Sequence, residues 1–115
     1  MISDKTELKT AVNLIKGGDL SSAHQIVQTF EGIPVADTTH AVIHRREGDF
    51  ANSLYWWRRV GGNVPHELIS LYGDPATFTA ALRDGCVTGD TGTILDSELS
   101  ALVDAVESSV LVDSE

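Results

Sequence analysis

Residues 40–62, HAVIHRREGDFANSLYWWRRVGG, concentrate the side chains that could carry chemistry. The segment holds two of the four histidines of the chain and four arginines, beside the consecutive rings of Tyr55, Trp56 and Trp57. A helix turns by about 100° per residue, so Asp37, His40, His44 and Glu47 fall within an arc of about 80°. One helix face therefore presents two imidazoles between two carboxylates.

This face has the residue types and spacing of a metal site. Two histidines at i and i+4 can each direct a ring nitrogen at one ion, and zinc accepts three nitrogens with one oxygen. A histidine on the preceding helix supplies the third nitrogen. The candidate ligands are His24, His40, His44 and Glu47. Zinc, iron and manganese are the candidate ions.

Two other interpretations of the histidine face stay open. The histidines also suit a helical core, where Glu47, Asp37 or the backbone would satisfy their ring nitrogens, and this structural interpretation is favoured. Acid–base catalysis without a metal would need His40 or His44 to open onto a cavity. The HExxH protease motif is absent, because Ala41 stands where that helix has its glutamate.

The three consecutive rings cannot all face one core, because they point about 100° apart around their helix. We expect at least one ring to be partly exposed. Rings and guanidinium groups are enriched where proteins dock. The candidate docking residues are Arg45, Tyr55, Trp56, Trp57 and Arg58. Alternatively, neighbouring helices clasp this helix on several sides, and its arginines pair with Glu47, Asp49 or the acidic C-terminal half.

Helical spacing of apolar residues runs through the whole chain. It predicts helices over about 5–16, 20–30, 37–47, 50–60 and 65–72, a helix from Pro75 that stops at Gly85, and an amphipathic C-terminal helix after a capping box at Thr93 and Asp96 that reaches Val110. No segment shows sustained two-residue alternation, so the predicted fold class is all-α.

The first four helices read as two copies of one pattern, offset by 30 residues from Gly18-Asp19 to Gly48-Asp49. Small, turn and bulky positions match in order: Ala11, Gly18, Leu20, Ala23 and Val27 in the first copy, and Ala41, Gly48, Phe50, Ser53 and Trp57 in the second. The pattern resembles the tetratricopeptide repeat, whose period is about 34 residues. The resemblance implies two helical hairpins, at about 5–31 and 36–60.

Helices over 64–112 would close these hairpins into one domain, 1–115. More narrowly, AHQIVQ followed by HAVIHRREGDFANSLYWWRR resembles a family of short bacterial and fungal proteins without an established activity. That family implies no reaction, cofactor or partner.

Charge and composition narrow the function classes. The net charge is −9, and residues 61–115 hold ten acids with Arg83 as their one cation. This balance disfavours nucleic acid, whereas the arginines at 45, 46, 58 and 59 leave room for a small anionic ligand. One cysteine, Cys86, a polar start and no apolar run of about 20 residues predict a cytoplasmic protein that does not span a membrane.

Two functions of different classes follow. The leading hypothesis is a non-enzymatic binding or assembly module whose partner is another protein or a second copy. The alternative is a small metal-binding protein, or a metal-dependent enzyme that acts on a small anionic substrate through His24, His40, His44 and Glu47. The loop GCVTGDTGT favours a solvated connector over a nucleotide site, because it lacks the Gly-Lys-Ser/Thr ending and a phosphate would meet Asp84 and Asp90.

Overall fold

The computed structural model describes residues 3–86 and 91–109, and within them every regular element is a helix, with no strand. The helices are α1 (Asp4–Lys16), α2 (Leu20–Gln28), α3 (Pro34–Arg46), α4 (Phe50–Val60), the 3₁₀ turn η1 (Gly61–Asn63), α5 (His66–Tyr72), α6 (Pro75–Asp84) and α7 (Thr91–Ser108). The all-α class predicted from the apolar spacing is confirmed.

The two predicted turns have the same geometry. Each has a glycine with positive φ, 89° at Gly18 and 81° at Gly48, a conformation that costs a glycine little. In both turns the aspartate amide donates to the carbonyl five residues earlier at 2.8 Å. The carboxylates of Asp19 and Asp49 then cap α2 and α4 by accepting a backbone amide of the first turn.

Two helix starts differ from the sequence prediction. Helix α3 begins at Pro34 rather than near residue 37, because proline at the first helical position lacks only an N–H that would have had no partner. Helix α7 begins at Thr91, so Thr93 lies inside the helix and is not its cap. The predicted end of this helix at Val110 lies outside the described residues.

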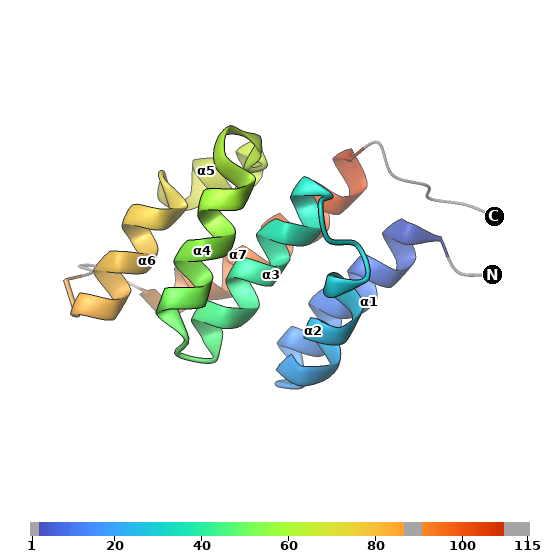
Figure 1. The fold of residues 1–115 in the computed structure, drawn as a ribbon, viewed down its shortest axis with the longest axis horizontal. Helices are drawn as coiled ribbons and strands as arrows, with labels where there is room; N and C mark the ends of the chain where they lie inside the picture. The colour runs from blue at the N-terminus through green and yellow to red at the C-terminus, as the bar shows by residue number, and fades with distance from the viewer. Residues whose placement is uncertain (1–2, 87–90, 110–115) are drawn as a thin grey trace.

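Helix α3 is the centre of the fold, and residues 35–43 are buried without interruption. It packs against α2, α4 and α7, while α1 packs against α2, and α6 against α4. Helix α7 runs behind α3 and also contacts α1 and α5 (Figure 1). One hydrophobic cluster joins α1–α5 to α7, and it includes Leu8, Val27, Ile43, Leu68 and Leu102.

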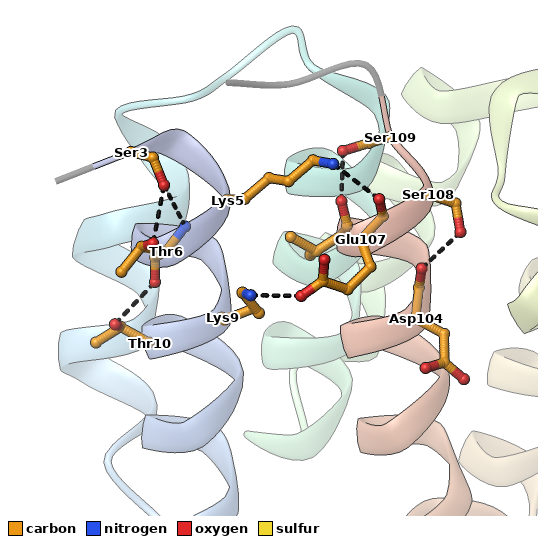
Figure 2. A network of polar contacts seen from close by, with 10 residues as sticks. Ser3, Lys5, Thr6, Lys9, Thr10, Asp104, Glu107, Ser108 and Ser109 are labelled. Atoms are coloured by element: carbon orange, nitrogen blue, oxygen red, sulfur yellow. Dashed lines mark hydrogen bonds and ion pairs between the residues drawn. The ribbon is translucent and has the colours of Figure 1, made fainter. Parts of the chain in front are cut away.

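A hydrogen bond and an ion pair connect the start of α1 to the end of α7 (Figure 2). The amino group of Lys5 donates to the carbonyl oxygen of Glu107 at 2.8 Å, and Lys9 pairs with the Glu107 carboxylate. Ser3 caps α1 by accepting the amide of Thr6 at 3.1 Å. A cation at the carbonyl end of α7 also suits the helix dipole.

None of the helices in the described ranges is both long enough and apolar enough to cross a lipid bilayer.

Candidate metal centre

Helices α2 and α3 bring three of the predicted ligands together. His24 projects from α2, and His40 and His44 lie one turn apart on α3. One donor atom from each lies within 4.8 Å of the other two, and the Nε2 atoms of His24 and His40 are 2.9 Å apart. Ring centroids are separated by 4.5 to 5.2 Å. We call these three residues the histidine cluster.

His40 forms the buried side of the cluster. It is 3 % exposed, and its ring stacks on Trp56 with centroids 3.9 Å apart. Burial, and then the neighbouring His24 and His44, lower the pKa of His40 to about 3, with a smaller contribution from Arg59. His40 is therefore neutral at pH 7, which is the form of imidazole that binds a metal.

His44 forms the outer side and faces two carboxylates. Its Nδ1 lies 3.1 Å from Oε1 of Glu47 and 3.8 Å from Oδ2 of Asp49. Nδ1 makes no hydrogen bond in the described residues, although the Glu47 carboxylate stands close enough for one after a small rotation. With Nδ1 turned to this carboxylate, Nε2 is the nitrogen left for an ion. Glu47, which the sequence suggested as the fourth ligand, stands instead beside His44 and outside the group of mutually close donor atoms.

Asp37 shares the helix face but not the cluster. Its two carboxylate oxygens each accept the amide of Gly32 at 3.2 Å, which ties α3 to the connection before it. Burial raises the pKa of Asp37 above its usual value, although this hydrogen bond opposes the shift. Among the described residues, His40 bonds through Nε2 to His24 and its Nδ1 has no partner, so the hydrogen bond to Asp37 that the structural interpretation allowed is not formed.

A surface pocket of about 320 Å³ adjoins the cluster. Its lining residues are Ser21, His24, His44, Glu47 and Asp49. No lysine or arginine is among them. The carboxylate of Asp49 is held in place, because it accepts the side-chain amide of Asn52 at 2.7 Å. The pocket is therefore an acidic recess with two imidazoles in its wall.

The arginines at 45 and 46 point away from this pocket and toward Glu98 of α7. Arg45 is 4 % exposed and Glu98 is fully buried, and the two form an ion pair. Arg46 donates to the same carboxylate oxygen from Nη2 at 3.0 Å and from Nε at 3.2 Å. Arg45, which the sequence placed among the docking residues, is therefore not a surface residue. Arg59, on α4, lies 3.8 Å from Glu31 and not beside the acidic C-terminal half.

The five predicted docking residues do not form one surface, because some of them are buried in the core. Trp56 and Trp57 are buried, and the indole N–H of Trp57 donates to the hydroxyl of Thr79 at 2.9 Å. Tyr55 is 49 % exposed, which confirms that one ring reaches solvent. Of the five candidate docking residues, Tyr55 and Arg58 are exposed.

Sequence reasoning missed the role of Glu98. It stands among Leu95, Leu99 and Leu102 on the apolar stripe of α7, and a carboxylate at such a position indicates a buried partner. Tyr72, also missed, stacks on Phe78 with centroids 4.5 Å apart, and the Arg45 guanidinium lies 5.6 Å from the centre of the Phe78 ring. Glu98, Arg45 and Tyr72 support the packing of the fold, and none of them lines the acidic pocket.

In the comparison with known proteins, no protein-family model, curated protein or solved structure matches the chain. The likeness to tetratricopeptide repeats therefore stays a prediction from the sequence pattern, and the function has to be argued from the residues.

The low pKa of His40 predicts acid sensitivity of the metal-free protein. The folded pKa, about 3, lies below the unfolded value of about 6.5, so the unfolded chain binds the proton first as the pH falls. Stability is complete above about pH 6.5 and declines toward pH 3. Between pH 7 and pH 5 we expect a loss of about 2 kcal/mol in urea unfolding with chelator present.

The matched variant His40→Gln removes this titration and keeps a polar side chain at the same place. Its free energy of unfolding should fall less between pH 7 and pH 5 than that of the parent protein. Equal losses in the two proteins would show that His40 is not the group responsible.

Proposed function

We propose that this protein binds one divalent transition-metal ion, with zinc preferred, through His24, His40 and His44. The convergence of three histidine donor atoms within 4.8 Å carries the proposal. Three imidazoles suit zinc better than manganese, which favours carboxylate and water ligands. Iron is less favoured, because no carboxylate belongs to the group of close donor atoms.

Binding needs small movements of the rings, because donor atoms up to 4.8 Å apart would have to approach one another by as much as about 1.5 Å. Zinc binds histidine nitrogen at about 2.0–2.1 Å, so two nitrogens of a tetrahedral site lie about 3.3 Å apart. The 2.9 Å between the Nε2 atoms of His24 and His40 would have to widen by a few tenths of an ångström. The imidazole hydrogen bond of the metal-free cluster would be exchanged for two bonds to the ion.

The surroundings of the cluster also support a metal ligand set. His40 is neutral at pH 7, so binding of an ion releases no net proton from its ring. One of the two Nε2 atoms that share the hydrogen bond carries a proton, which would move to Nδ1 of the same ring when both nitrogens bind the ion. Glu47 stands 3.1 Å from Nδ1 of His44, where metal sites place a carboxylate that orients the ring. Both features favour binding over a purely structural role.

Zinc titration of untagged protein, purified without added metal, tests the proposal. We expect one equivalent of zinc per chain and, with free zinc at 100 times Kd, a stabilisation of about 2.7 kcal/mol. For a chain of this length the melting temperature should rise by about 10 °C. EDTA should reverse the rise. Absence of stoichiometric binding and of any shift would overturn the proposal.

The exposed ring of Tyr55 supports a second candidate, the binding or assembly module. The Arg59 guanidinium lies 5.9 Å from the centre of the Tyr55 ring and 4.9 Å from that of Trp56. An exposed ring with an arginine over it resembles the anchors of protein interfaces. If α4 mediates self-association, Tyr55→Ala should raise the dimer dissociation constant at least about tenfold in sedimentation. An unchanged dimer dissociation constant would show that Tyr55 does not bind a second copy of the chain.

A further inference from the structure

We infer that the histidine cluster leaves one coordination position open toward the acidic pocket, and that this position takes a small neutral or cationic ligand. The ligand would coordinate through a nitrogen or oxygen lone pair and donate a hydrogen bond to Glu47. The inference rests on the proposed metal site and adds the chemical class of the molecule that the site accepts.

The arrangement of the cluster gives the site an inner and an outer side. His24 and His44 line the pocket, whereas His40 lies behind them, 3 % exposed against Trp56. An ion held by all three would therefore have protein on its inner side and the pocket on its outer side. Structural zinc sites are closed by four protein ligands, whereas sites with an exchangeable ligand have three.

Glu47 is the carboxylate nearest to closing the site, but its position favours another role. Its Oε1 faces Nδ1 of His44, on the side of the ring away from the nitrogen left for the ion. From there the carboxylate can accept a hydrogen bond from a molecule in the pocket. A ligand with an N–H or O–H beside its coordinating atom would satisfy both the ion and Glu47.

The charge of the pocket decides the ligand class. Two carboxylates, Glu47 and Asp49, balance the two positive charges of the ion, and the other lining residue outside the cluster is the neutral Ser21. An anion would approach both carboxylates, and at about 4 Å each repulsion costs about 1–4 kcal/mol, depending on solvent screening. Asp49 is held by Asn52 and cannot turn away without losing that hydrogen bond.

The pocket also limits the size of the ligand. A volume of about 320 Å³ lies at the lower end of the range for small-molecule sites. The anionic substrate expected from the sequence depended on arginines beside the histidines, but Arg45 and Arg46 are paired with Glu98. Small amines, imidazoles and alcohols are therefore the class that fits.

Cobalt(II) substitution of the full chain tests this inference, because its visible absorption reports the ligands of the ion. The probes are imidazole, which is neutral and carries an N–H, and azide, which is a smaller anion that also coordinates through nitrogen. We expect imidazole to change the spectrum saturably, and azide to need at least about a tenfold higher concentration. Metal analysis after dialysis against each probe checks that cobalt stays bound.

Variants at two carboxylates sharpen the test. Glu47→Gln, loaded at saturating cobalt, should bind imidazole at least about threefold more weakly and azide at least about threefold more tightly, because a negative hydrogen-bond acceptor is lost. The matched control is Glu31→Gln, since Glu31 lies near Arg59, at 3.8 Å, and does not line the pocket. Both affinities of this control should equal those of the parent protein.

The outcomes separate the two proposals. Failure of the parent protein to bind cobalt or zinc would overturn the metal site itself. Bound cobalt whose spectrum neither probe changes would mean a closed site, which overturns the open position and leaves the metal site standing. Azide that binds as tightly as imidazole would overturn the ligand class alone.

Discussion

Glu98→Gln is expected to lower the free energy of unfolding by about 3–5 kcal/mol, which is the usual loss when one partner of a buried ion pair is removed. Glu98 is fully buried on α7, and its carboxylate faces Arg45 and Arg46 of α3. The glutamine has the same shape but no charge. The Arg45 guanidinium would then stay buried without a counter-charge. Glu98, which now neutralises it, is 53 residues away in the sequence.

Urea unfolding followed by circular dichroism measures this loss, and α7 supplies a matched control. Glu107 on the same helix pairs with Lys9 at the surface (Figure 2). Exposed ion pairs contribute about 0–1 kcal/mol, so Glu107→Gln should change the free energy of unfolding by less than about 1 kcal/mol. Similar losses in the two variants would contradict the view that the Glu98 pairs hold α7 against α3.

His24→Gln is expected to weaken zinc binding by at least about 100-fold, because it removes one of three ligands. His24 is the one cluster residue on α2, so the change leaves the central helix α3 untouched. Glutamine can still reach toward Nε2 of His40 and keep a hydrogen bond there. The metal-free variant should therefore melt within a few degrees of the parent protein.

His66→Gln is the matched control for this prediction. It makes the same chemical change at the fourth histidine of the chain, which lies on α5 with 85 % of its side chain exposed. Competition with a chromophoric chelator should give this variant the zinc affinity of the parent protein. The zinc-induced rise in melting temperature should persist in His66→Gln and disappear in His24→Gln. Equal zinc affinities in the two variants would show that the histidine cluster is not the zinc-binding site.

The predictions that proved reliable depend on neighbours in the sequence. The apolar spacing, the glycines at 18 and 48 and the aspartate caps act within one turn of chain, so the sequence alone determines the helices and the two matching turns. The i, i+4 spacing likewise determined that His40 and His44 share one face. The prediction was wrong at two helix starts: α3 begins at Pro34, since proline fits a first helical position, and α7 begins at Thr91, before the predicted cap at Thr93.

Contacts between helices decided which of the candidate side chains are buried and which are exposed. Spacing along one helix cannot state which of three consecutive rings faces solvent, because that depends on where α6 and the neighbouring helices pack around α4. The same holds for Arg45, which the sequence placed among the candidate docking residues and which the fold buries against Glu98. Burial of a charge is stable only where a partner converges on it, and such convergence is a property of the assembled fold.

The candidate site follows the same division. The sequence determined the ligand types and the pair on α3, since a helix fixes the separation of residues four apart. Only the packing of α2 against α3 brought Nε2 of His24 to 2.9 Å from Nε2 of His40. The fold also placed Glu47 beside His44 rather than within the cluster. Positions far apart in the sequence meet where burial of apolar surface places their helices, and no local pattern encodes that distance.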